Sequence, residues 1–261
     1  MTDPFSLSDV CRLAVFGHPA HELAIYGLLQ RHRPHVVVIT DGGGPERIEQ
    51  SKAGFARAGM LDWVTYLNFS ESSFYDALLD EESDLFLRVA EKLRVEIQRI
   101  QPDQLFCDAI EFYNPVHDVT RPILLNALAG DEKRSLYEIP LVYQKPDESE
   151  VYAIQRVPEE QAHLRFQYDL TPDELELKVY ARDHIYANLR EQAGPEFLAT
   201  TPEYLSREEI ADANGPLPDA ATSGRVLRYE WRAKLLQERG VIPQAITYQD
   251  HFLPAVARLL I

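Results

Sequence analysis

Hydrophobic residues in the first half of the chain alternate between short continuous runs and longer stretches with helical spacing. A continuous apolar run bounded by turn residues is typical of a strand buried on both faces of a parallel sheet. Such runs occupy residues 11–17, 35–41, 63–69 and 105–109. Apolar residues at helical spacing predict helices between them. These helices begin near His21 and at Pro45, and two more cover residues 73–101 and 119–128.

This alternation predicts the fold class. Strand–helix–strand units with right-handed crossovers give a doubly wound, Rossmann-like α/β sheet whose strands are mostly parallel. Ligands of such sheets bind beyond the carboxyl ends of the strands. His18, Asp41 and the segment after Asp108 each follow a predicted strand, so we expect them at one edge of the sheet.

The second half of the chain has a weaker pattern. Residues 136–144 and 151–157 are predicted strands, and the polar residues 145–150 between them are a predicted hairpin loop. A helix is expected after Thr171, a good N-cap residue that acidic residues follow. Residues 194–224, rich in Pro, Gly, Asp and Ser, are predicted to form an irregular surface excursion.

Length and composition indicate one globular domain. The chain has 261 residues, of which 45% are hydrophobic, so it can bury a large core. We expect a single α/β domain over residues 1–261, with its core at about 10–145 and a C-terminal elaboration at about 146–261. Cys11 and Cys107 fall in predicted strands and are expected to be reduced, packed thiols.

The net charge of −16 disfavours nucleic-acid and anionic membrane partners, because the field of the protein would repel phosphates. The N-terminus lacks a basic stretch before an apolar run, and no apolar segment approaches the roughly 20 residues of a membrane helix. We therefore expect a cytoplasmic protein that acts on a small molecule. Whether it forms a homo-oligomer is left open.

Several common site motifs are absent. Gly42, Gly43 and Gly44 follow the second predicted strand, but the dinucleotide fingerprint requires G-x-G-x-x-G after the first. The sequence also lacks a P-loop, a G-x-S-x-G elbow and an H-E-x-x-H motif. A nicotinamide cofactor and an ordinary serine hydrolase are therefore disfavoured.

Histidines at strand ends point instead to a metal. The first predicted strand runs into G-H-P-A-H-E, which contains His18 and His21, and His117 lies in the loop region after the fourth strand. Three neutral imidazoles with water in the fourth position are a common catalytic zinc site. The alternative interpretation is a polar turn that merely contains two histidines.

Two segments in this order resemble a known family. V-F-G-H-P-A-H-E before a helix, and N-P-V-H-D-V-T-R-P before a later one, are similar to the A-H-P-D-D-E and H-x-D-H segments of the PIG-L/LmbE zinc-dependent N-acetylglucosaminyl deacetylases. E-R-I-E-Q-S-K-A also stands where that family has R-x-x-E-x-x-x-A. The resemblance covers roughly residues 10 to 130.

The resemblance implies roles for individual residues. His18 matches the first metal ligand of the family and His117 the last, while His21 stands where the family has a ligating aspartate. Histidine keeps a donor at that position, and zinc or another divalent metal such as iron is the implied cofactor. Glu22 matches a glutamate that either orients a ligand or interacts favourably with the helix dipole.

Two departures affect catalysis. Ala20 occupies the position of the family's general base, and Asn114 that of a histidine that stabilises charge in the transition state. Replacement bases are therefore expected among nearby carboxylates. Asp41 is the first candidate. Others lie around the third ligand: Asp108, Glu111 and Asp118.

Further residues are candidates for substrate contact or structure. Tyr113 either donates to an oxyanion or packs, and Asp118 either acts in catalysis or supports the helix start. Glu111, Arg228 and His251 are candidate substrate-binding residues. The alternative for the segment around Arg228 is an amphipathic helix with a solvated face.

Two functions of different classes follow. The first is a divergent metal-dependent hydrolase that removes an acyl group, such as acetyl, from an amide on an amino sugar or glycoconjugate. The second, favoured by Ala20, is a non-catalytic protein of the same fold that binds a metal or sugar. Redox chemistry at an iron-loaded site is also left open.

Overall fold

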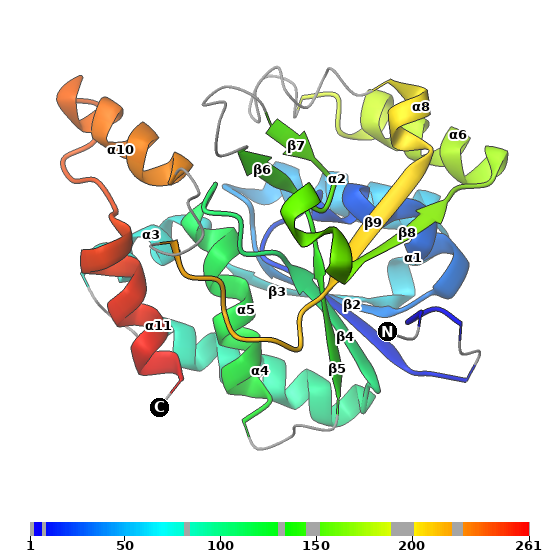
Figure 1. Cartoon of the computed structure of the whole chain (residues 1–261), viewed down its shortest axis with the longest axis horizontal. Coiled ribbons are helices and arrows are strands. Elements are labelled where there is room, and N and C mark those ends of the chain that lie inside the picture. Colours follow the sequence, from blue (N-terminus) through cyan, green and yellow to red (C-terminus); the bar gives the residue numbers. More distant parts are fainter. Residues whose placement is uncertain are drawn as a thin grey trace.

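The chain folds around one seven-stranded sheet with the strand order β3-β2-β1-β4-β5-β9-β8 (Figure 1). The computed structural model describes residues 3–6, 9–80, 84–129, 134–144, 152–188, 201–220 and 227–260. The strands of the sheet are β1 (Arg12–Phe16), β2 (His35–Thr40), β3 (Val64–Phe69), β4 (Gln104–Asp108), β5 (Ser135–Ile139), β8 (Arg165–Asp169) and β9 (Arg207–Asp212). The first five run parallel, while β9 runs antiparallel to β5 and to β8.

Helices cover both faces of this sheet (Figure 1). The first half contributes the 3₁₀ turn η1 (His21–Ile25), α1 (Tyr26–His32), α2 (Pro45–Arg57), the 3₁₀ turn η2 (Leu61–Trp63), α3 (Glu71–Leu79), α4 (Asp84–Ile100) and α5 (Pro115–Ala127). The second half adds the hairpin β6 (Val142–Gln144) and β7 (Tyr152–Ile154), the 3₁₀ turn η3 (Glu159–Leu164), α6 (Pro172–Tyr180), the π-helical turn η4 (Ala181–Ile185), α8 (Pro202–Leu205), α10 (Arg228–Glu238), the π-helical turn η6 (Tyr248–Phe252) and α11 (Leu253–Leu259).

The parallel half of the fold confirms the sequence prediction. All four predicted strands are present in one sheet with parallel neighbours, and the fold is a mostly parallel α/β sandwich. One element differs: residues 73–101 do not form a single helix. The chain turns at Asp80, where α3 has ended, and α4 begins at Asp84.

The prediction that residues 194–224 form an irregular excursion is wrong for residues 202–212, which contain α8 and β9. This region contains β9, which lies inside the sheet between β5 and β8. Glu208 and Glu209 give the strand a polar sequence, yet both are almost fully buried. Neither β9 nor β8 was predicted. The predicted hairpin loop at 145–150 lies outside the described residues, but β6 and β7 on either side pair antiparallel.

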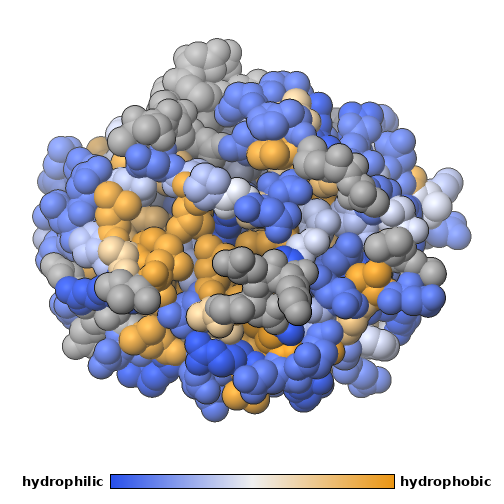
Figure 2. All heavy atoms as spheres, turned by 60° about the horizontal axis from the view of Figure 1, so that its bottom comes forward, coloured by the Kyte–Doolittle hydropathy of each residue, from blue (hydrophilic) through white to orange (hydrophobic). Residues whose placement is uncertain are grey.

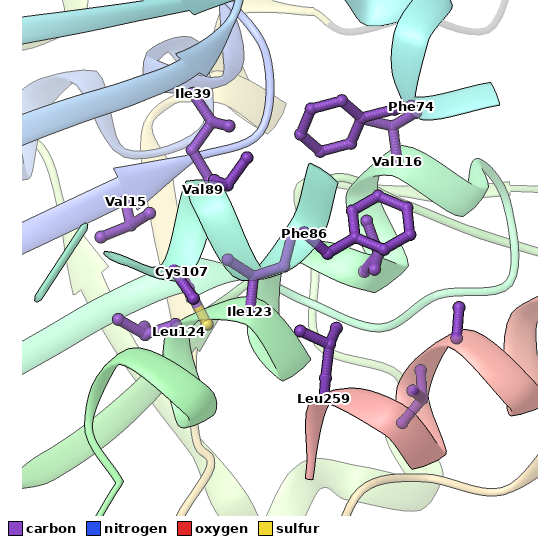
Figure 3. Packing of buried hydrophobic residues seen from close by; sticks show 14 of the residues in the cluster. Val15, Ile39, Phe74, Phe86, Val89, Cys107, Val116, Ile123, Leu124 and Leu259 are labelled. Atoms are coloured by element: carbon purple, nitrogen blue, oxygen red, sulfur yellow. The ribbon is translucent and has the colours of Figure 1, made fainter. Parts of the chain in front are cut away.

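Alternate residues of the buried strands face opposite cores. Val15, Ile39 and Cys107 pack with side chains of α3, α4, α5 and α11 on one face (Figure 3). Phe16 and Val38 pack with α1 and α2 on the other. Cys107 is fully buried and Cys11 is partly exposed, and both are free thiols, as predicted.

One face of the protein is hydrophilic around its periphery. Figure 2 shows this face, with hydrophobic side chains gathered mainly at and to the left of its centre. Among the described helices, none is both long and apolar enough to cross a membrane.

Phe86 and Leu87 provide a matched test of the core around α4. Phe86 is fully buried, whereas 40% of Leu87 is exposed on the same helix. We expect Phe86→Ala to lower the free energy of unfolding by about 3–5 kcal/mol because it leaves a cavity. Leu87→Ala should change it by no more than about 0.5 kcal/mol. Chemical denaturation measures both, and equal effects would contradict this packing.

Candidate functional site

Three histidines from distant parts of the chain meet at the carboxyl edge of the sheet. His18 follows β1, His21 begins η1, and His117 lies in the first turn of α5. Their ring centres are 5.0 Å (His18–His21), 5.0 Å (His18–His117) and 4.4 Å (His21–His117) apart. We call these residues the histidine trio. The predicted convergence of the three rings is therefore present.

Each ring has a carboxylate near its Nδ1 atom; Asp108 and Glu111 are buried, and Glu71 is partly exposed. Asp108 Oδ2 is 2.8 Å from Nδ1 of His21. Glu71 Oε1 is 3.5 Å from Nδ1 of His18. Glu111 Oε2 is 4.0 Å from Nδ1 of His117. Where Nδ1–H of a neutral imidazole faces a carboxylate, Nε2 is left as the electron-pair donor.

The carboxylates are themselves held by other groups. Oδ2 of Asp108 accepts the backbone amide of Gly17 at 2.6 Å, and Glu71 accepts the hydroxyl of Tyr75 at 2.9 Å. Oε1 of Glu111 accepts the amides of Leu141 and Val142 at 2.5 and 2.9 Å. Such fixed partners restrict the orientation of the rings that they face.

Burial governs the protonation of the site. It lowers the pKa of His18 and His21 well below the ordinary range, and the charge of His117 and of Arg47 adds to this effect. Burial also lowers the pKa of His117, although Asp108 and Glu71 oppose the shift. For Asp108, burial raises the pKa to about 7. The imidazoles are thus held neutral, which is the protonation state of a metal ligand.

The donor set partly fits a transition metal. Three imidazoles bound to one ion at about 2.0–2.1 Å would have ring centres roughly 4.5–5.3 Å apart, close to the spacing of the trio. Nε2 of His18, Nδ1 of His117 and Oδ1 of Asp108 are buried without a hydrogen bond. Even so, no group of three or more His, Cys, Asp or Glu within the described ranges is placed to hold an ion.

The turn that carries His21 is conformationally strained. Ala20 has φ of 78°, in the left-handed region that side chains other than Gly, Asn and Asp avoid. Phe112, in the loop before α5, has φ of 59°. Strain of this kind persists only where surrounding contacts hold the backbone. Both site loops therefore depend on the packing around them.

Glu22 points away from solvent into a polar pocket. It is fully buried, and its Oε1 accepts the hydroxyls of Ser51 at 2.6 Å and Tyr186 at 2.5 Å. Burial raises its pKa, and these two hydrogen bonds oppose the shift. The side chain therefore binds partners from α2 and from the turn after η4.

The predicted catalytic residues lie around the trio, but most are engaged with backbone. Asp41 Oδ1 accepts the amides of Gly43 and Glu71 at 3.1 and 2.9 Å. Asn114 caps α5 by accepting the amide of Val116 at 2.8 Å.

Asp118 and Tyr113 lie in the same region. Asp118 is fully buried and accepts the amides of Glu111 and Phe112 at 2.8 and 3.1 Å, so it supports the loop before α5. The ring of Tyr113 is 6.2 Å from that of His117. Catalytic roles for these residues remain predictions.

The predicted substrate-binding residues have different surroundings. Glu111 is buried beside His117, as described above. The amide of Arg228, at the start of α10, donates to Phe112 O at 2.8 Å, and its guanidinium lies 4.7 Å from the ring centre of Trp231. His251 Nδ1 accepts the amide of Thr247 at 3.0 Å. A substrate contact for Arg228, Glu111 or His251 remains a prediction.

Sequence reasoning missed two residues at the site. Glu71 begins α3, where an acidic residue is common at any helix start, and only the fold brings it beside His18. Arg47 lies in the first turn of α2 and donates to Pro19 O at 3.0 Å. Arg47 lies in the E-R-I-E segment that carries part of the family resemblance, so the sequence did contain a signal for this residue.

The parallel strands, their crossovers and the polar carboxyl edge define a doubly wound, Rossmann-like α/β protein. Its structure is similar to that of the A40926 pseudoaglycone deacetylase Dbv21, with a TM-score of 0.56 and 14% identity over 78% of this chain and 96% of the other. It is also similar to a deacetylase of the teicoplanin pathway in complex with bog, with a TM-score of 0.55 and 14% identity over 77% and 96%.

A third similar structure is the zinc-inhibited form of the teicoplanin deacetylase Orf2, with a TM-score of 0.55 and 13% identity over 78% of this chain and 99% of the other. No protein-family model and no curated protein matches the sequence. The chain therefore has the fold of these deacetylases, in agreement with the fold that the family resemblance implies.

Gly17 provides a test of the packing beneath the trio. A Cβ atom there would lie 2.7 Å from Thr120 Oγ1 and 3.0 Å from Asp108 Oδ2. We expect Gly17→Ala to lower the free energy of unfolding by about 1–3 kcal/mol through overpacking. Gly215→Ala is the control, because a Cβ at Gly215 meets nothing within 4 Å. Thermal denaturation compares the two, and equal effects would contradict this close approach.

Proposed function

We propose that the protein is a divergent member of the PIG-L/LmbE deacetylases. In this proposal it is a metal-dependent hydrolase that removes an acyl group from an N-acyl amino sugar or a related glycoconjugate. The observation that carries the proposal is the histidine trio with a carboxylate within 4.0 Å of each Nδ1, hydrogen-bonded at His21. The deacetylase fold supports the reaction class.

His18, His21 and His117 would hold the metal. The chemistry that such an ion supplies is polarisation of the amide carbonyl and a lowered pKa of bound water. Zinc is the first candidate, but one structural neighbour is a zinc-inhibited deacetylase, so iron and cobalt belong in the same test.

The residues of the chain itself perform the remaining tasks. Asp108 is hydrogen-bonded to the ring of His21, and Glu71 lies 3.5 Å from Nδ1 of His18, so both are carboxylates that could accept a proton near the trio. Asp41, the base predicted from the sequence, contacts this group through the amide of Glu71. The side-chain amide of Asn114 donates to Tyr75 at 3.3 Å and so lies next to Glu71.

The second candidate function is binding without catalysis. It is favoured by Ala20, since an alanine cannot accept a proton at the position of the family's base. The two candidates share the metal site and differ only in turnover, so one pair of measurements separates them.

The first measurement is metal content. We expect the purified protein to bind about one equivalent of Zn²⁺, Fe²⁺ or Co²⁺, and His117→Ala to lose it because three imidazoles are needed to complete the set. His163→Ala is the control, because His163 is an exposed residue of η3. Equilibrium dialysis with elemental analysis checks this. Equal metal content in His117→Ala and wild type would end the metal proposal.

The second measurement restores a base. Ala20→Asp places a carboxylate at the family position, on a left-handed backbone that Asp tolerates. Acetate release from N-acetylglucosamine should rise by about 10²–10⁴-fold relative to wild type, the usual contribution of a positioned base. Ala20→Asn, with the same shape and no base, should not raise it. If the metal-loaded wild type releases no acetate, the deacetylase proposal fails and the binding function is favoured, even where Ala20→Asp is active.

A further inference from the structure

Tyr186 connects the C-terminal half of the chain to the turn that carries His21. Its side chain is 1% exposed, and its hydroxyl donates to Oε1 of Glu22, the residue after His21. The hydroxyl fits into a notch over Gly54 of α2, where an added Cβ would lie 2.1 Å away. Tyr186 therefore packs closely against Gly54, and its hydroxyl contacts Glu22.

Lys178 and Glu208 hold the same segment a few residues further on. Glu208, in β9, accepts the amides of Gly27 and Leu28 at 2.9 and 2.8 Å. Lys178, in α6, donates from Nζ to Ala24 O at 3.2 Å and to Glu208 at 2.8 Å. Lys178 and Glu208 are 1% and 0% exposed, so these contacts are made away from solvent.

Residues 20–28 have little conformational stability of their own. It begins at Ala20, which has a left-handed backbone, and η1 that follows is a 3₁₀ turn without a side-chain cap. Short 3₁₀ turns have poor hydrogen-bond geometry and little intrinsic stability. Residues 20–28 therefore require contacts from other parts of the protein to keep one conformation. His21 is one of these residues.

We propose that Lys178, Tyr186 and Glu208 form a clamp that fixes the conformation of residues 20–28 and thereby the position of the His21 ring. They are positioning residues: none of them contacts the histidine trio, and each acts through Glu22 or the backbone of residues 24–28. The link to metal binding rests on the proposed function, whereas the link to the conformation of the turn does not.

The test variant is Tyr186→Phe, which removes only the hydroxyl. Tyr204→Phe is the matched control, because its hydroxyl donates to Ile154 O at 2.5 Å in the same half of the chain, away from the turn. Co²⁺ affinity is measured by calorimetry, and amide exchange of residues 20–28 by mass spectrometry. Tyr186→Phe should weaken Co²⁺ binding, by less than the about 10–100-fold lost when a partner bonded directly to a ligand is removed, because Tyr186 acts through Glu22. Exchange of residues 20–28 should be about tenfold faster.

Each outcome has a definite meaning. The clamp is supported if both changes occur in Tyr186→Phe and neither in Tyr204→Phe, with equal melting temperatures for the two variants. It is overturned if affinity and exchange in Tyr186→Phe equal those of the control. If the wild type binds no Co²⁺, the proposed metal function fails, and the exchange rates alone decide whether the clamp exists.

A conservative change at Glu22 tests whether the hydrogen bonds of this residue or its charge are needed. It also provides a second variant in case Tyr186→Phe misfolds. In Glu22→Gln the amide oxygen can still accept from Tyr186 and Ser51. We expect Co²⁺ affinity within about threefold of wild type, and a loss of about tenfold or more in Glu22→Ala. Equal affinities for Glu22→Ala and wild type would overturn the clamp.

Discussion

The site depends on one buried carboxylate that joins two neighbouring strands. Because β1 and β4 pair in parallel with Val15 opposite Cys107, Asp108 at the end of β4 lies beside Gly17 at the end of β1. A fully buried carboxylate is costly unless its oxygens are hydrogen-bonded. Oδ2 of Asp108 meets this requirement with the Gly17 amide and the His21 ring, whereas Oδ1 has no hydrogen bond. The need to satisfy one buried group therefore fixes a strand end and a ring together.

The need of buried polar groups for hydrogen-bond partners also explains which strands the sequence could and could not predict. Strands β1, β2 and β4 are buried on both faces, so their apolar runs predict them directly, whereas the edge strand β3 is only partly buried. Strand β9 contains Glu208 and Glu209, whose partners are the amides of Gly27 and Leu28 and the amide of Val157. A polar strand that is buried by distant hydrogen bonds has no local hydrophobic signal, so the sequence alone suggested a loop.

At the candidate site, too, some residues could be predicted from the sequence and others could not. The strand-end histidines could be found by position, because parallel strands bring their carboxyl ends to one edge. Glu71 could not be found in this way. It lies near His18 because α3 packs against α5 and because the backbone amide of Glu71 donates a hydrogen bond to Asp41. Residues recognised through a local motif are thus predictable, whereas those that act through packed neighbours require the fold.

Relative to the family pattern, H-P-A-H-E removes two carboxylates from the turn itself. The structure has carboxylates in another place, beside the Nδ1 atoms of the rings. A neutral ligand such as His21 donates less charge to a cation than aspartate does, and a carboxylate on its Nδ1–H raises the basicity of the ring. In the proposed metal site, this negative charge would therefore lie beside the rings and not in direct contact with the ion. Asp108, which is hydrogen-bonded to His21, is the carboxylate best placed to supply it.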